Sequence, residues 1–293
     1  MQLRAIVTGS GGILADSLQP LLIENGYAVC ATDIVASKDI ALLDIRNLED
    51  VIHCVTTYRP DIIFHLAAET DVDKCELNPA HGYETNVKGA QNIAVACKTL
   101  DIPMVYISTG SVFDGKKTTG YTEMDKPNPV SVYGISKLKG EEIVASTLTK
   151  YYIIRAGWMI GRYHKDKKFV GKILQLLKTK KEIPVVTDKI GSPTFTKDFS
   201  QGILGIVTGC AYGLYHCVNK GICTRFDIAE KIKEYVRADD VTLRPVTSDF
   251  FPLPAPRPAS EALLNHKLSL LGLDTMRPWQ DALKEYIEEM RTA

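Results

Sequence analysis

The chain has 293 residues, of which 45% are hydrophobic and 24% charged, and its 35 basic residues balance its 35 acidic ones. These values are typical of a globular protein with a sizeable core, and the zero formal charge gives no electrostatic basis for binding nucleic acid or an anionic membrane. No apolar run approaches the roughly 20 residues of a membrane span, no signal peptide precedes the first predicted strand, and seven cysteines without a Cys-x-x-Cys suit a reducing compartment. We therefore expect a cytoplasmic protein.

A glycine-rich turn follows the first predicted strand, which covers residues 3–7, and leads into an apolar-periodic helix that ends near residues 25–26. Gly9, Gly12 and Ala15 have the spacing G-x-x-G-x-x-A. Such a turn needs glycine for its tight bend and for close approach of the backbone to a pyrophosphate, which lies at the positive end of the following helix. The turn therefore predicts a dinucleotide site, with a plain glycine loop as the alternative.

The second predicted strand, residues 27–32, ends at Asp33. A carboxylate about two dozen residues after the first glycine can accept hydrogen bonds from an adenosine ribose and would repel a 2′-phosphate, which favours NAD(H). Lys38 nearby could still serve NADP(H), so both cofactors stay open. A short strand over residues 42–45 would bring Asp44 and Ile45 to the adenine, and a helix over residues 47–58 follows.

Residues 62–66 form a nearly continuous apolar run, as expected of a strand that is covered on both faces. The small residues Ala67 and Ala68 at its end leave space for a dinucleotide to lie across the sheet. His65, inside the run, is interpreted as a core residue rather than a catalyst. A long helix over residues 81–101, which carries Asn86, and a strand over residues 104–108 continue the alternation.

The most informative stretch is residues 131–137, where Tyr133 and Lys137 lie four positions apart and hence on one face of a helix predicted over residues 131–149. An ammonium near a phenol favours the phenolate, lowers the phenol's pKa and makes a usable general acid. The strand before this helix delivers Thr109 to the mouth of the sheet. Together the three side chains could polarise a carbonyl and protonate the alkoxide left by hydride addition. A surface tyrosine beside a solvated lysine is the alternative.

Strand–helix alternation from residue 1 to about 155 predicts an α/β fold, a doubly wound parallel (Rossmann) sheet that binds ligands beyond the carboxyl ends of its strands. We expect residues 1–155, with a return segment near 195–220, to form the dinucleotide-binding domain. Residues 156–194 and 221–293 would form a smaller α/β substrate domain. The polar loop over residues 113–129, between the two chemical elements, is a candidate binding loop or lid.

This combination resembles the extended short-chain dehydrogenase/reductase superfamily. Within it, residues 61–76, 107–141, 155–158, 188–194 and 256–258 are similar to the dTDP-4-dehydrorhamnose reductases. The resemblance implies reduction, by NAD(H) or NADP(H), of the 4-keto group of a nucleotide-linked 6-deoxy sugar. It implies that Thr109 holds the substrate oxygen, Tyr133 supplies the proton, and Lys137 binds the nicotinamide ribose and tunes Tyr133.

The turn, the strand ends and the resemblance together give two sets of predicted site residues. The cofactor set is Gly9, Ser10, Gly12, Ile13, Leu14, Asp33, Asp44, Ile45, Leu66, Ala67, Ala68, Thr70, Asn86, Tyr133 and Lys137. The substrate set is Val72, Thr109, Gly110, Ser111, Trp158 and Arg257. Arg257 lies in the proline-rich segment 251–258, which cannot be a helix or a central strand and is either a linker or a rigid wall that directs the guanidinium towards a diphosphate.

Three departures from the resembled family matter. Gly110 and Ser111 stand where the family usually has Asp and Tyr, which leaves the exact sugar open and argues against the water elimination of the related dehydratases. Ala15 replaces the third glycine of the nucleotide loop, a mild change. Ser17 stands near the place of a glutamate that bridges metal-linked dimers in some members, so we predict no metal, while a homodimer stays compatible with the resemblance.

Two other functions remain open. A nucleotide-sugar epimerase would use the same three residues but keep its cofactor bound throughout. A non-catalytic regulatory subunit resembling the β subunit of methionine adenosyltransferase would use the fold for binding alone. The expected ligand is in every case a small molecule, with neither nucleic acid nor membrane as a partner.

The remaining segments give weaker signals. Residues 165–168 are a charge run, interpreted as a solvated loop or alternatively as a phosphate clamp. A helix over residues 169–180 would cover the substrate, and Thr224 and Asp227 have the spacing of a capping box before a helix that ends at 236. Cysteines 210, 217 and 223 are interpreted as buried thiols, because their spacing matches no familiar metal site.

Overall fold

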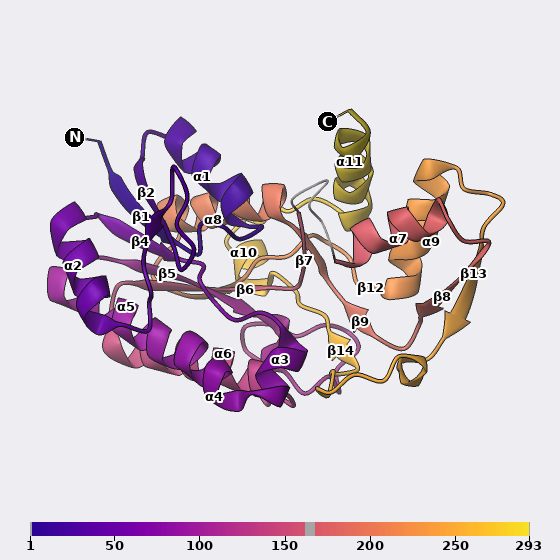
Figure 1. Ribbon diagram of the computed structural model, residues 1–293, viewed down its shortest axis with the longest axis horizontal. Coiled ribbons are helices and arrows are strands. Elements are labelled where there is room, and N and C mark those ends of the chain that lie inside the picture. The colour runs from indigo at the N-terminus through magenta and orange to yellow at the C-terminus, as the bar shows by residue number, and fades with distance from the viewer. Residues whose placement is uncertain (1, 162–167, 293) are drawn as a thin grey trace.

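The computed structural model describes residues 2–161 and 168–292, which form two lobes (Figure 1). Within these ranges, the larger lobe contains a seven-stranded parallel sheet with the order β11-β6-β5-β4-β1-β2-β3. Its strands are β1 (Arg4–Thr8), β2 (Ala28–Asp33), β3 (Ala41–Leu42), β4 (Ile62–His65), β5 (Met104–Thr109), β6 (Tyr151–Ala156) and β11 (Gly213–His216). The strand order reverses between β1 and β4, which confirms the predicted doubly wound sheet.

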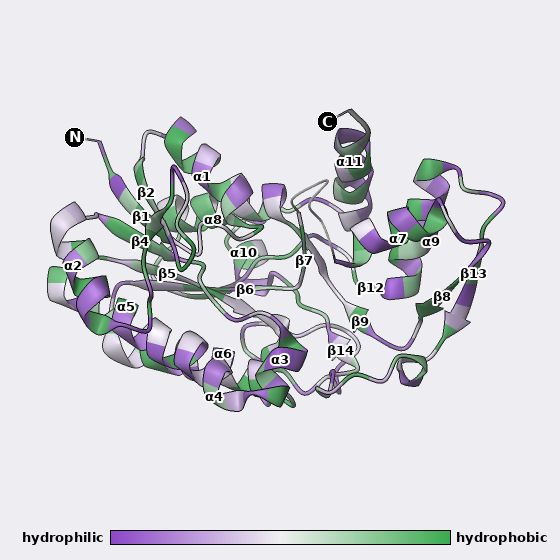
Figure 2. Cartoon of the chain, in the orientation of Figure 1, coloured by the Kyte–Doolittle hydropathy of each residue, from purple (hydrophilic) through white to green (hydrophobic). Residues whose placement is uncertain are grey.

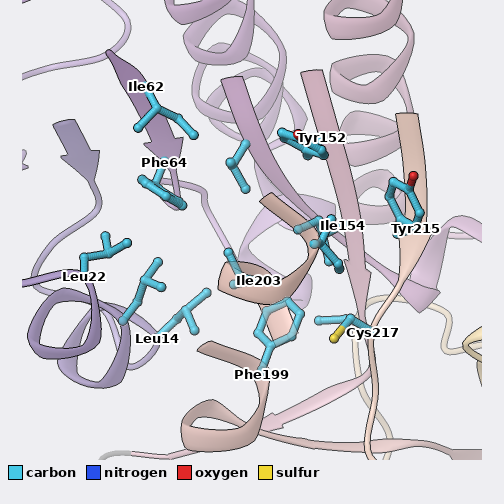
Figure 3. Packing of buried hydrophobic residues seen from close by; sticks show 14 of the residues in the cluster. Leu14, Leu22, Ile62, Phe64, Tyr152, Ile154, Phe199, Ile203, Tyr215 and Cys217 are labelled. Atoms are coloured by element: carbon cyan, nitrogen blue, oxygen red, sulfur yellow. The ribbon is translucent and has the colours of Figure 1, made fainter. Parts of the chain in front are cut away.

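Helices cover both faces of this sheet, because alternate strand residues face two separate hydrophobic layers. On one face, α1 (Ala15–Glu24) and α8 (Thr196–Gly209) pack against strand residues that include Phe64 and Ile154 (Figure 3). The other face carries α2 (Leu48–Tyr58), α5 (Gly89–Leu100) and α6 (Val132–Thr147). Burial on both sides explains the continuous apolar run at residues 62–66, and Figure 2 shows hydrophobic residues along these strands.

The smaller lobe has its own hydrophobic core, formed by short strands and three helices. Its strands are β7 (Trp158–Ile160), β8 (Glu182–Val186), β9 (Ile190–Gly191), β10 (Pro193–Phe195), β12 (Cys223–Thr224), β13 (Thr242–Val246) and β14 (Ser260–Glu261). Its helices are α7 (Phe169–Leu177), α9 (Arg225–Val236) and α11 (Trp279–Thr292). The predicted capping box at Thr224 and Asp227 starts α9 and is confirmed. After β10 the chain returns through α8 and β11 to the larger sheet, and α10 (His266–Leu270) contacts β11.

Two predicted elements differ from the structure. The strand expected over residues 42–45 stops at Leu42, because the carboxylate of Asp44 accepts a hydrogen bond from the backbone N–H of Arg46 and turns the chain. The single helix expected over residues 81–101 is α4 (Pro79–Tyr83), a π-helical turn (Glu84–Lys88) and α5, and a further short helix, α3 (Val72–Leu77), precedes it. Asn86 lies in the π-helical turn.

Three other expectations concern the chain as a whole. Of the charge run at residues 165–168, all but Lys168 lies outside the described residues. Among the described helices, none is both long and apolar enough to span a membrane. The seven cysteines are free thiols, of which Cys217 and Cys223 are buried and Cys210 is half-buried.

Candidate active site

A cavity of about 750 Å³ lies where the carboxyl ends of β1, β2, β4 and β5 face the smaller lobe. Its lining begins at the glycine turn after β1 and continues past the start of α6 to β7, α7, α9 and β14. The volume falls within the range of about 300–1,000 Å³ that is usual for ligand sites. Both lobes therefore contribute to one site.

The glycine turn forms one end of this cavity. Gly9 has φ +71°, and a Cβ placed there would lie 2.6 Å from the backbone N of Ala67, so a side chain fits neither the conformation nor the space. The N–H of Gly12 donates to the Gly9 carbonyl, which closes the turn at 3.0 Å directly before α1. A backbone that is bare of side chains at a helix N-terminus fits the pyrophosphate of a dinucleotide, so the residues present suit the predicted cofactor.

The adenosine end of the site carries charges of both signs. The Asp33 carboxylate accepts hydrogen bonds from the N–H groups of Gly11 (2.9 Å) and Val35 (3.1 Å), which fix it at the cavity wall. Arg46, which the sequence analysis did not single out, also lines the cavity and is held by Asp44 at 2.6 Å. The hydrogen bond from Arg46 lowers the pKa of Asp44. A carboxylate suits a ribose diol and a guanidinium suits a 2′-phosphate, so the wall has groups for either cofactor.

Tyr133 and Lys137 lie one turn apart on α6, as predicted, and both line the cavity with Thr109 at the end of β5. The helix begins where the Ser131 hydroxyl accepts from the Gly134 N–H and the Glu76 carboxylate accepts from the Val132 N–H. These caps fix the first turn of α6, which carries the tyrosine.

The electrostatics of Tyr133 differ from the expectation based on Lys137 alone. Burial raises the pKa of Tyr133 and outweighs the lowering effect of a hydrogen bond with Thr109, and the nearby charge of Glu261 raises it further. The expected lowering by Lys137 is therefore wrong for this phenol, because desolvation dominates. At neutral pH Tyr133 is a protonated phenol, which is the form that a proton donor needs.

Lys137 is itself deeply buried. Its ammonium lies 4.1 Å above the ring centre of Tyr106, and burial lowers its pKa to about 7 although the carboxylate of Glu141 opposes this. His65 stacks on the Tyr106 ring, accepts or donates a hydrogen bond at Nδ1 to Thr8, and has a pKa lowered to about 3 by burial. Its Nε2 has no partner among the described residues. His65 is thus a neutral core residue beneath the site.

A buried ion pair supports α6 from below. Arg155 donates to Glu141 through Nε (2.9 Å) and Nη2 (2.6 Å), and both side chains are 5% exposed or less. The Ser108 hydroxyl also donates to Glu141, and Nη1 of Arg155 lies 3.4 Å from Nε2 of His216. This network joins α6 to β5, β6 and β11, so that it fixes the helix relative to the end of β5.

Most of the predicted site residues line the cavity. They are Gly9, Gly12, Ile13, Leu14, Asp33, Asp44, Ile45, Leu66, Ala67, Ala68, Thr70, Val72, Thr109, Ser111, Tyr133, Lys137, Trp158 and Arg257. Three lie behind the lining instead: the Ser10 hydroxyl donates to the Val7 carbonyl, Asn86 joins Glu69 to Ser136, and Gly110 packs beneath Glu261.

Arg257 lines the cavity but is already engaged. Its Nη1 and Nη2 donate to the two carboxylate oxygens of Asp73 at 3.0 and 2.9 Å, and Nη1 also donates to the Ala255 carbonyl. Three of its five N–H groups are therefore used within the protein. The pair fastens the proline-rich segment to the start of α3.

Sequence reasoning missed two charged residues in the wall contributed by the smaller lobe. Arg225, the first residue of α9, lies with its guanidinium 3.7 Å above the Trp158 ring centre, and burial lowers its pKa to about 10. Glu261, in β14, accepts hydrogen bonds from Ser111 Oγ and from Trp158 Nε1, the latter at 2.9 Å. The capping box before Arg225 was the available signal for that position, whereas Glu261 belongs to no motif.

Comparison with known proteins gives consistent results. The family model described as "RmlD substrate binding domain" matches residues 3–292. The spore coat polysaccharide biosynthesis protein SpsK of Bacillus subtilis is 36% identical over 99% of both chains. A dTDP-4-dehydrorhamnose reductase of Mycolicibacterium smegmatis is 34% identical over 98% of this chain and 86% of that protein. The crystal structure of a dTDP-4-dehydrorhamnose reductase from Bacillus anthracis, in complex with NADP, is 37% identical and has a TM-score of 0.92, covering 99% of this chain and 100% of that one.

Proposed function

The chain belongs to the RmlD substrate binding domain family, and from this premise we propose that it reduces the 4-keto group of a nucleotide-linked 6-deoxy sugar with NAD(P)H. Relatives that match nearly the whole chain are named dTDP-4-dehydrorhamnose reductases, and one of them was crystallised with NADP. The single observation that carries the proposal is the continuity of the cavity. It runs from a dinucleotide turn, past Thr109, Tyr133 and Lys137, to a wall with charged side chains.

The chemistry follows from the three side chains beside the expected carbonyl. NAD(P)H, when bound, supplies the hydride that reduces the carbonyl carbon. Thr109 holds the carbonyl oxygen through its hydroxyl, and the phenol of Tyr133 donates the proton that this oxygen takes up. The ammonium of Lys137 stabilises the phenolate that Tyr133 becomes, so that the positive charge lies where negative charge develops.

The diphosphate of the substrate needs donors, and two guanidinium groups, those of Arg225 and Arg257, lie in the part of the cavity wall that the smaller lobe contributes. Arg257 retains part of its donor capacity beside Asp73. Arg225 has its donors free of ion pairs with described residues and lies against the rings of Trp158 and Phe169. The charge of Glu261 acts on this buried guanidinium without forming an ion pair with it, and a diphosphate would satisfy its donors with paired oxygens. We therefore assign Arg225 the main contact with the diphosphate.

The expected place of action is the cytoplasm, which is supported by the free thiol state of the cysteines.

The test is the absorbance band of NADH or NADPH after purified protein is mixed with dTDP-4-keto-6-deoxy-L-mannose. We expect the cofactor to be consumed only when the sugar is present. Comparing the rates with NADH and with NADPH shows whether Asp33, which suits a ribose diol, or Arg46, which suits a 2′-phosphate, decides the cofactor. A sugar that changes without net cofactor consumption would identify an epimerase. A protein that binds cofactor, turns over no keto-sugar and copurifies with another enzyme would be a regulatory subunit.

A further inference from the structure

We propose that Glu261 determines which sugar the site accepts, by accepting a hydrogen bond from the hydroxyl group on the ring carbon next to the substrate carbonyl. This inference rests on the proposed reduction of a 4-keto sugar and concerns the part of the site that recognises the sugar ring. The corresponding hydroxyl of that substrate is on C3.

The position of Glu261 is fixed by short, local pairing rather than by a long element. The two residues of β14 pair in parallel with β9, and Glu261 lies opposite Gly191. A Cβ at Gly191 would overlap the Trp158 ring, so the absence of a side chain there lets the indole lie beside the glutamate. The segment is also held where the Ser192 hydroxyl bonds to the backbone of Leu263 at 3.1 Å. Glu261 is thus presented to the cavity from a rigid wall.

The carboxylate of Glu261 belongs to a chain of hydrogen bonds that reaches the catalytic threonine. One oxygen accepts from Trp158 Nε1 at 2.9 Å and the other from Ser111 Oγ, which in turn lies 3.3 Å from Thr109 Oγ1. The charge of Glu261 also raises the pKa of Tyr133, which agrees with a short separation between the two groups. The carboxylate therefore lies next to the place where the proposed carbonyl is reduced.

The remaining bonding capacity of Glu261 faces the cavity. Each carboxylate oxygen can accept two hydrogen bonds, and each has one donor within the described residues. No cation among those residues forms an ion pair with it, since Arg225 lies over the indole face while the glutamate contacts the indole N–H. A partly buried carboxylate with unused acceptor positions is costly unless a ligand supplies donors. A sugar hydroxyl is a neutral donor of suitable size.

Gly110, between Thr109 and Ser111, leaves the space that β14 and its Glu261 need. A Cβ at Gly110 would lie 2.8 Å from the backbone oxygen of Glu261, so any larger residue there would displace β14. The small residues at positions 110 and 111 thus leave room for a carboxylate that arrives from 150 positions later in the chain. These positions and Glu261 act as one unit.

The experiment compares kcat/KM for dTDP-4-keto-6-deoxy-L-mannose and its 3-deoxy analogue, in the native protein, in Glu261→Ala and in Glu261→Gln. Hydrogen bonds to charged groups predict that the native protein prefers the 3-hydroxyl substrate on the order of 10- to 100-fold. We expect Glu261→Ala to lower this preference to near unity and Glu261→Gln to lower it in part. Asp249→Asn, an exposed carboxylate before the proline-rich segment, is the matched control and should keep the native preference.

Fluorescence titration of NADPH separates a specificity role from a folding defect, because the glycine turn and Asp33 belong to other elements than β14. Unchanged cofactor affinity with a lost preference supports the inference. Equal losses on both sugars, or a native preference in Glu261→Ala, would overturn it while leaving the reductase intact. Solvent deuterium that enters C3 or C5 only when Glu261 is present would also overturn it, because the carboxylate would then be a base. No turnover by the native protein would overturn the proposed function first.

Discussion

Lys137 offers the sharpest quantitative test of the site, through the substitution Lys137→Met. The side chain is 3% exposed and its pKa is lowered from 10.5 to about 7, mainly by burial. Between these two values the unfolded chain binds the proton and the folded protein does not, so the native protein gains stability as the pH rises. Methionine has similar length without a charge, so it removes this dependence.

The size of the effect follows from the two pKa values. Burial of Lys137 lowers the stability of the folded protein by about 5 kcal/mol at pH 6, where both states are protonated, and by about 2 kcal/mol at pH 9, where the lysine loses its proton on folding. Lys137→Met should therefore be more stable than the native protein at pH 6, and its advantage should shrink by about 3 kcal/mol towards pH 9.

The assay is urea unfolding of both proteins at pH 6 and pH 9, with activity measured in parallel. Lys139→Met, on the same helix but exposed, is the matched control and should show no such change with pH. Lys137→Met should lose turnover even though it gains stability. A stability difference that stays constant between the two pH values would refute the lowered pKa inferred for the buried Lys137.

Three further substitutions test the other parts of the cavity. Tyr133→Phe should lower turnover on the order of 10²-fold or more while NADPH still binds in fluorescence titrations; full activity would show that the tyrosine is not the proton donor. Arg225→Gln should weaken the binding of free dTDP in calorimetry by about 10-fold or more, whereas Lys231→Gln on the same helix should not. If both variants bind dTDP equally well, Arg225 does not contact the diphosphate. Gly9→Ala should destabilise the protein by about 1–3 kcal/mol in urea and abolish cofactor binding, since its Cβ would strike Ala67; normal binding would contradict the assignment of the turn.

The sheet was predictable because its signals are local. The apolar run at residues 62–66 indicates burial on both faces, and the spacing of Gly9 and Gly12 indicates a turn that excludes side chains. Tyr133 and Lys137 share a helix face whatever surrounds them. Each of these features depends on a few neighbouring residues, so the sequence alone contains it.

The wall contributed by the smaller lobe depends on contacts between distant segments. Glu261 reaches Ser111 only because a two-residue strand pairs with β9, and such a short element has no periodicity to detect. Arg257 was predicted to face a diphosphate from its place after a proline-rich segment, but the sequence gives no sign that Asp73 engages it. The pKa of Tyr133 was predicted in the wrong direction because burial cannot be read from a motif.

The central claim is net reduction of a sugar carbonyl, and the most direct measurement follows the hydrogen itself. NADPH carrying deuterium at the transferable position of nicotinamide C4 is mixed with the protein and dTDP-4-keto-6-deoxy-L-mannose, and the product is analysed by mass spectrometry and NMR. The proposed function predicts one deuterium on C4 of the product sugar for each cofactor oxidised, and labelling that is slower on the order of 10²-fold or more with Tyr133→Phe. A product without deuterium, formed with no net oxidation of the cofactor, would contradict it.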